Sequence, residues 1–325
     1  MLKKLISLHG PSGRENPVAE YIINELKGIA EVSRDTMGNV IAHIPGPGKK
    51  LLLAAHMDEI GVMITFADDK GFLRFAPVGG LTAVNLCHKR VILPSGRTGV
   101  ISYPGKLSPS EIKVSEMFID IGCSSRDEAK KYADIGDMAV FESNFYEDET
   151  RIVSGKLDDR LGCFLLLELA KKVKNPVCDL FIAFTVQEEV GLRGAGPATF
   201  GIEPYMAIAV DVTGTGDTPD SNTMAVSIGG GAAIKIKDGR MVASTQVRIL
   251  LENICKENDI PCQPEVLAGG TTDGAVMQIT GPGTLAGAIS VPTRYIHTTS
   301  ETVAKKDVEA AGMLLEKLAF SGDLK

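Results

Sequence analysis

The chain has 325 residues, of which 44% are hydrophobic and 23% charged, and this is enough globular material for one large domain or for two. The formal net charge of −7 and the lack of any basic run argue against a nucleic-acid partner. No apolar stretch approaches the roughly 18 residues of a membrane span, so no membrane partner is expected either.

The first 65 residues predict an alternation of helix and strand. Segments 2–8 (LKKLISL) and 16–28 (NPVAEYIINELKG) have the apolar spacing of amphipathic helices, and the second follows a turn-forming sequence, PSGREN. The first segment is too short for a secretion signal, and the six cysteines form no CxxC pair, so we expect a cytoplasmic protein. Residues 31–44 predict a β-hairpin that turns at MGN, and 51–55 (LLLAA) predict a buried strand.

Residues 66–155 have a different sequence pattern. Short β-like pieces alternate there with Gly and Pro signals, and a single helix-like stretch, SSRDEAKKYADIG, interrupts them at 124–136. We therefore predict a smaller, mainly β domain inserted at 66–155, which divides a larger domain into residues 1–65 and 156–325.

After residue 155 the alternation of helix and strand resumes. The apolar spacing predicts helices at 161–173, 244–258, 273–279 and 307–320, and strands at 179–189, 205–213, 262–268 and 284–292. Such alternation is typical of an α/β domain with a largely parallel sheet flanked by helices.

Polar residues gather where the predicted buried strands end. In open α/β sheets ligands bind beyond the carboxyl ends of the strands, so side chains at these ends are expected to share one rim. The strand-end residues are His56, Asp58, Glu188, Glu189, Asp211 and His297, and a further cluster, Leu157-Asp158-Asp159-Arg160, precedes a helix.

Histidine and carboxylate ligands without a thiolate suit zinc, cobalt or manganese. Two imidazoles and at least three carboxylates are too many for a single four-coordinate site with an open position, and they suit two ions that share a carboxylate and a water. On a strand Asp58 would face the same side as His56 and could orient its ring. The adjacent Glu188 and Glu189 would point opposite ways, so that one binds metal while the other acts as general base.

Five motifs, AAHMDEIG, GKLDDRLG, TVQEEVGLRGA, AVDVT and YIHTTSE, resemble in this order those of the tetrahedral di-metal aminopeptidases. That family also contains glutamyl aminopeptidases and proteins labelled cellulase M. The resemblance covers essentially the whole chain, including the insert. It implies a zinc-exopeptidase-like fold and removal of N-terminal residues from peptides, with a water that bridges two divalent ions, zinc or cobalt, as the nucleophile.

The resemblance also implies roles for individual residues. Asp158 would bridge the two ions, with His56 and Asp211 completing one metal position and Glu189 and His297 the other. Glu188 would be the general base and Asp58 the residue that orients His56, and a cis peptide would join the two aspartates of DDR. The inserted domain would mediate dimerisation and assembly into a hollow dodecamer.

Other interpretations stay open. The same metal centre could serve a deacylase or another amide or glycan hydrolase, and an assembly protein could keep a purely structural metal site. His9, His43 and His88 are expected to be structural, and Asp159 is expected either to support the site or to pair with Arg160. Residues 269–273 (GGTTD) could contact substrate or simply cap a helix. The glycine clusters lack the spacing of a nucleotide-binding loop.

Overall fold

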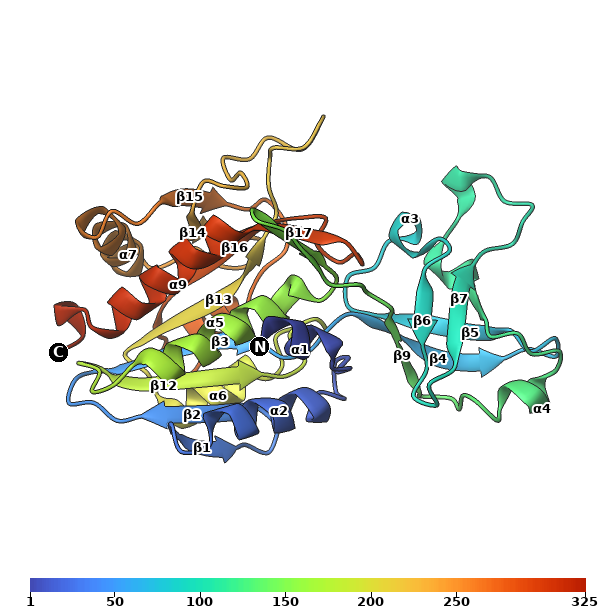
Figure 1. The fold of residues 1–325 in the computed structure, drawn as a ribbon, viewed down its shortest axis with the longest axis horizontal. Coiled ribbons are helices and arrows are strands. Elements are labelled where there is room, and N and C mark those ends of the chain that lie inside the picture. The colour runs from blue at the N-terminus through green and yellow to red at the C-terminus, as the bar shows by residue number, and fades with distance from the viewer.

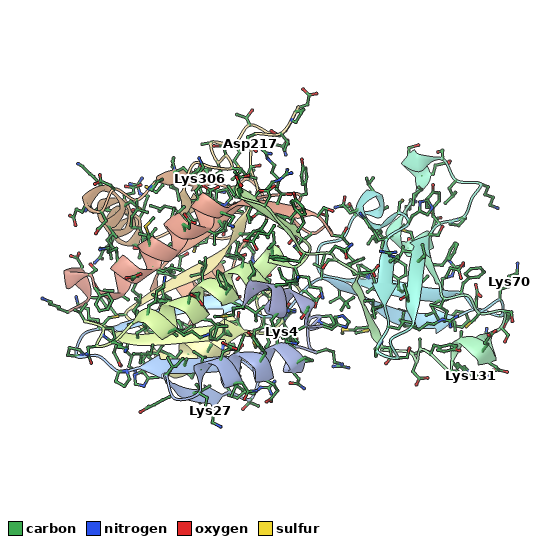
Figure 2. The ribbon with its side chains drawn as sticks, viewed as in Figure 1. Lys4, Lys27, Lys70, Lys131, Asp217 and Lys306 are labelled. Carbon is green, nitrogen blue, oxygen red and sulfur yellow. The ribbon has the colours of Figure 1, made fainter. Side chains whose placement is uncertain are left out.

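The computed structural model describes residues 1–325, with the side chain of Pro109 left aside. Figure 1 shows two lobes, a large one built on a twisted sheet and a smaller barrel to its right. In Figure 2 the lysines of both lobes, Lys27, Lys70 and Lys131 among them, project outward from the periphery.

The described part of the large sheet has 11 strands, and a parallel set lies at its centre. The strand order is β1-β2-β12-β3-β13-β16-β17-β11-β10, with β14 and β15 attached beside β16. Neighbours among β12, β3, β13 and β16 are parallel. Their bounds are β1 Glu31–Arg34, β2 Val40–Ile44, β3 Lys50–His56, β10 Tyr146–Glu147, β11 Arg151–Ser154, β12 Asp179–Thr185, β13 Met206–Thr213, β14 Ala232–Lys237, β15 Cys262–Val266, β16 Leu285–Arg294 and β17 Glu301–Ala304.

Helices cover both faces of the sheet, and their apolar sides form two cores. Residues of α1, α2, α5, α7 and α9 share one core with one face of the strands, and residues of α6 and α8 share the other. Burial on both faces explains why every residue of β13 is buried and why its sequence is almost wholly apolar. The bounds are α1 Leu2–Ser7, α2 Asn16–Leu26, α5 Leu157–Lys172, α6 Ala195–Ile202, α7 Thr245–Glu257, α8 Gly274–Ile279, α9 Lys305–Ala319 and η3 Gly322–Leu324. The predicted α/β fold with a largely parallel sheet is confirmed.

The smaller lobe is a closed antiparallel barrel with its own apolar core. Its strands, in the order β4-β5-β8-β7-β6-β9, are β4 Gly61–Ala67, β5 Leu73–Val78, β6 Arg90–Ile92, β7 Thr98–Ser102, β8 Phe118–Asp120 and β9 Met138–Phe141. Short helical turns connect them, α3 Ala83–Leu86, η1 Pro109–Glu111, η2 Val114–Glu116 and α4 Arg126–Ala129.

The strands of the barrel do not coincide with residues 66–155. They begin at Gly61, and β10 and β11 already pair with the large sheet through β17. The helix expected over 124–136 is confined to Arg126–Ala129, and turns follow it. Gly136, at the end of the expected stretch, has a left-handed φ of +91°, a conformation that favours glycine.

No helix in the part of the chain that the structure describes has the length and apolarity needed to cross a membrane.

Candidate metal centre

The carboxyl ends of four neighbouring parallel strands, β12, β3, β13 and β16, form one rim of the large sheet. His56 is the last residue of β3, and Asp211 lies near the end of β13. The turn after β12 carries Glu188 and Glu189, and His297 follows β16. The sheet therefore brings residues from distant parts of the chain to one edge, as expected for an α/β ligand site.

Two groups of side chains at this rim could each hold a metal ion, and Asp158 belongs to both. Donor atoms of His56, Asp158 and Asp211 lie within 4.8 Å of one another, as do those of Asp158, Glu189 and His297. His56 Nε2 lies 2.9 Å from Asp158 Oδ1, and His297 Nε2 lies 3.4 Å from Asp158 Oδ2. The five residues are those that the resemblance implies as ligands, and their role as ligands stays a prediction.

Asp158 is placed by an irregular first turn of α5. Its peptide bond to Asp159 is cis, and both residues have non-helical φ and ψ. Its backbone N–H donates to Glu301 Oε2 at 3.1 Å. Asp159 Oδ2 accepts the backbone N–H of His56 at 3.2 Å, so Asp159 supports the end of β3. The alternative pairing of Asp159 with Arg160 is wrong, because the ion-pair partner of the buried Arg160 is Glu59, at 3.1 Å.

The carboxylate of Asp58 contacts several residues around this site. Its Oδ1 lies 3.4 Å from His56 Nδ1 and accepts the backbone N–H of Glu188 at 2.9 Å. Its Oδ2 accepts the backbone N–H of Glu189 at 3.2 Å and the hydroxyl of Ser12 at 2.6 Å. Asp58 thus holds both glutamates as well as His56, and no sequence motif indicated its contact with Ser12.

Glu188 and Glu189 lie together in a turn beyond the end of β12 and not on the strand, which differs from the expected strand alternation. β12 ends at Thr185, and Gln187 has a left-handed φ of +56°. Glu189 Oε2 then lies 3.2 Å from His297 Nε2, while its buried Oε1 has no hydrogen-bond partner among the described residues. A buried carboxylate oxygen without a hydrogen-bond partner is expected where that oxygen would bind a cation.

Buried negative charge dominates the electrostatics of the rim. Burial, followed by the charge of Asp158, raises the pKa of Asp211 to about 8. Burial likewise raises the pKa of Glu188, with Asp211 and Asp273 adding to this and His56 opposing it, and burial raises the pKa of Glu189. Carboxylates that raise the pKa values of one another lack a counter-charge, which divalent cations would supply.

The neighbouring carboxylates raise the pKa values of the two histidines, against the effect of burial. Burial by itself would lower the pKa of His297, but hydrogen bonds to Asp158 and Glu189 raise it to about 12. Burial would raise the pKa of Asp158, yet hydrogen bonds from His297 and His56 lower it below its usual range. The imidazole nitrogens and the carboxylate oxygens thus face one another at 2.9–3.4 Å, with their lone pairs directed to the space that a metal ion would occupy. The donor set therefore fits two divalent ions.

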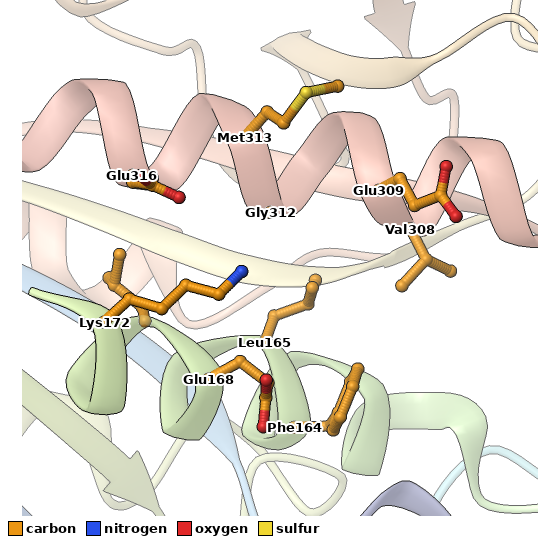
Figure 3. A pocket seen from close by; sticks show the side chains of 10 residues that line it. Phe164, Leu165, Glu168, Lys172, Val308, Glu309, Gly312, Met313 and Glu316 are labelled. Carbon is orange, nitrogen blue, oxygen red and sulfur yellow. The ribbon is translucent and has the colours of Figure 1, made fainter.

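A cavity of about 330 Å³ opens over these residues. Its other walls include Arg240, Leu267, Ile296 and the Gly270-Thr271 pair from the predicted GGTTD segment. Asp273 of that segment is buried and accepts a hydrogen bond from Thr185 at 2.5 Å. A separate hollow of about 370 Å³ between α5 and α9, shown in Figure 3, is lined by Phe164, Met313 and neighbours and includes none of the candidate ligands.

The sequence of this chain was compared with those of known protein families. A profile of the M42 glutamyl aminopeptidases matches residues 38–314. The chain belongs to this family. The M42 chain is 46% identical over 317 residues to a provisionally named aminopeptidase of Acetivibrio thermocellus, covering 97% of this chain and 96% of that one.

Two solved structures support the same assignment. Aminopeptidase APDkam598 of the archaeon Desulfurococcus kamchatkensis superposes with a TM-score of 0.94 at 38% identity, covering 98% of this chain and 93% of that one. The TET1 peptidase of Pyrococcus horikoshii, described as assembling into a tetrahedron or a large octahedral shell, superposes with a TM-score of 0.88 at 33% identity, and 98% of each chain is covered. The M42 protein is thus a peptide hydrolase of the aminopeptidase type, and M42 enzymes are metallopeptidases.

Proposed function

We propose that this protein is a dinuclear metal-dependent aminopeptidase that removes N-terminal residues from peptides. The observation that carries the proposal is the sharing of Asp158 between two ligand groups, with the carboxyl group of Glu188 beside them. His56, Asp158 and Asp211 would hold one ion, zinc or cobalt by the chemistry of the donors, and Asp158, Glu189 and His297 would hold the other.

The residues around the ligands have separate tasks. When bound, a pair of divalent ions polarises the scissile carbonyl group and lowers the pKa of a bound water. The Glu188 carboxylate accepts a proton from the attacking water and returns it to the nitrogen of the leaving amine. Asp58 holds the backbone of Glu188 and the ring of His56 in place for this transfer. A peptide α-amino group is cationic, so the carboxylate-lined cavity favours a free N-terminus.

The test is hydrolysis of a panel of aminoacyl chromogenic substrates, together with their N-acetylated forms and a soluble cellulose derivative. The purified protein is compared with protein stripped by a chelator and with stripped protein reloaded with cobalt or zinc. We expect cleavage of free-amino substrates only, almost complete loss of this activity on stripping, and its return on reloading. Cleavage of N-acyl or glycan substrates instead, by protein that binds two ions, would favour the alternative of a deacylase or another amide or glycan hydrolase with the same centre.

We further propose that the chain forms a cytoplasmic homo-oligomer, from a dimer to a dodecamer. The β-rich insert, expected at 66–155 and built as a barrel from strands between Gly61 and Phe141, would be its assembly domain. The similarity to the shell-forming TET1 peptidase supports this. Multi-angle light scattering on metal-loaded protein should give a mass that is a multiple of 34.5 kDa. A monomer mass at the concentrations of the activity assay would contradict it.

A further inference from the structure

The barrel contacts the candidate metal centre through two consecutive glycines. Gly79 and Gly80 directly follow β5, and Gly80 lines the same cavity as Asp158 and His297. No motif of the inserted segment indicated this contact. It means that the smaller lobe supplies part of the wall of the site.

A hydrogen bond joins the barrel to one candidate ligand. His297 Nδ1 lies 2.8 Å from the carbonyl oxygen of Gly80. Because a carbonyl oxygen can only accept, Nδ1 must carry the hydrogen and donate it. Nε2 then faces Glu189 Oε2 at 3.2 Å and Asp158 Oδ2 at 3.4 Å. Metal-binding histidines commonly donate the other ring N–H in this way, which fixes the ring and its tautomer.

The two glycines are fitted closely against the side chains of this ligand group. A Cβ added to Gly80 would lie 2.9 Å from His297 Nδ1, and one added to Gly79 would lie 3.0 Å from Glu189 Oε2. Gly79 also needs its φ of +85°, which other residues rarely adopt. The φ of Gly80 lies outside the left-handed region, so this angle does not require a glycine. The absence of a side chain at Gly80 is therefore explained by the approach of His297.

A second segment of the barrel contacts the loop that carries His297. Lys89, which immediately precedes β6, donates from Nζ to Thr299 Oγ1 at 3.2 Å. Thr299 lies two residues beyond His297, so the loop that carries this histidine is contacted by the barrel on both sides of Thr298. His56 and Asp211, in contrast, lie on β3 and β13 of the large sheet itself.

We propose that the barrel positions one ligand of the metal centre. The Gly80 carbonyl fixes the ring of His297, and this sets the affinity of the Asp158–Glu189–His297 position for its ion. The inference rests on the proposed metal centre. Its consequence is that a shift of the barrel against the large sheet would weaken this position while leaving the His56–Asp158–Asp211 position intact.

The test is Gly80→Ala, with Gly105→Ala as the matched control. Gly105 is also a barrel glycine with a backbone open to other residues, but no described heavy atom lies within 4 Å of a Cβ placed there. Metal-free full-length proteins are titrated with Co²⁺ by calorimetry, and their folding is compared by circular dichroism. In Gly80→Ala we expect one of two affinities to fall by about 10- to 100-fold, as for losses of groups that orient ligands elsewhere, with the other within about threefold of the wild type. Gly105→Ala should retain both affinities.

Each outcome has one meaning. A wild-type protein that takes up fewer than two ions contradicts the proposed metal centre itself. Two wild-type affinities that both survive in Gly80→Ala overturn the positioning role of the barrel while leaving the metal centre standing. Equal loss of both affinities also overturns it, because the substitution would then act on the fold as a whole and not on His297.

Discussion

Glu188→Gln is expected to lower kcat by roughly 10²- to 10⁴-fold, the usual contribution of a general base, while both metal ions stay bound. The amide keeps the size of the side chain and cannot take a proton from the attacking water. Glu188 is in neither candidate ligand group, and its backbone N–H, held by Asp58 at 2.9 Å, is unaffected by the change. The ligand geometry should therefore survive.

The measurement pairs steady-state kinetics with metal analysis of the same sample. Glu257→Gln serves as the control, since Glu257 is an exposed residue at the end of α7. The role of Glu188 is refuted if the variant binds two ions and keeps kcat within about threefold of the wild type, because a missing general base costs far more. A loss of one ion together with activity would instead make Glu188 a ligand.

The sequence predicts the large sheet well because its central strands are buried on both faces. β3, β12, β13 and β16 are short apolar runs, and burial on both sides leaves little choice of residue. Several elements were missed, α6, β14 and β17 among them. α6 has the glycine- and proline-containing sequence AGPATFGI, which gives no helical signal. β14 and β17 are short and carry polar residues that mask their strand character.

The rim of the site was predictable for a different reason. Polar residues at the ends of parallel strands must share one edge of the sheet, so proximity follows from the topology. The supporting contacts cannot be read this way. Ser12 is 46 residues from Asp58, and Gly80 is 217 residues from His297. Each contact depends on how a loop packs against the sheet, and neither residue type is unusual in a turn.

A buried ion pair lies behind the Asp211 side of the centre. Lys235 of β14 and Glu265 of β15 are both 0% exposed and form a short ion pair. Glu265 Oε1 also accepts the hydroxyl of Thr213 at 2.7 Å, and Thr213 stands two residues after Asp211 on β13. The alternating sequence AAIKIK hides this pair, since a lysine in a strand is ordinarily expected at the surface.

Lys235→Met is expected to destabilise the protein by about 3–5 kcal/mol, the usual cost of leaving one partner of a buried pair without its counter-charge. The apolar replacement fills the space of the lysine stem but leaves Glu265 charged and fully buried. Lys237→Met is the matched control. Lys237 is an exposed residue of the same strand, and a surface substitution of this kind should change stability by less than about 0.5 kcal/mol.

The double variant Lys235→Met with Glu265→Gln decides whether charge is the cause. Removing both charges should restore most of the stability lost in Lys235→Met, because a neutral pair carries no comparable desolvation cost, and the amide oxygen still accepts from Thr213. Urea unfolding is followed on metal-free proteins at one concentration, so that ligand binding and assembly do not alter the comparison. A double variant as unstable as Lys235→Met alone would mean that lost packing around the lysine stem, and not an uncompensated carboxylate, accounts for the effect.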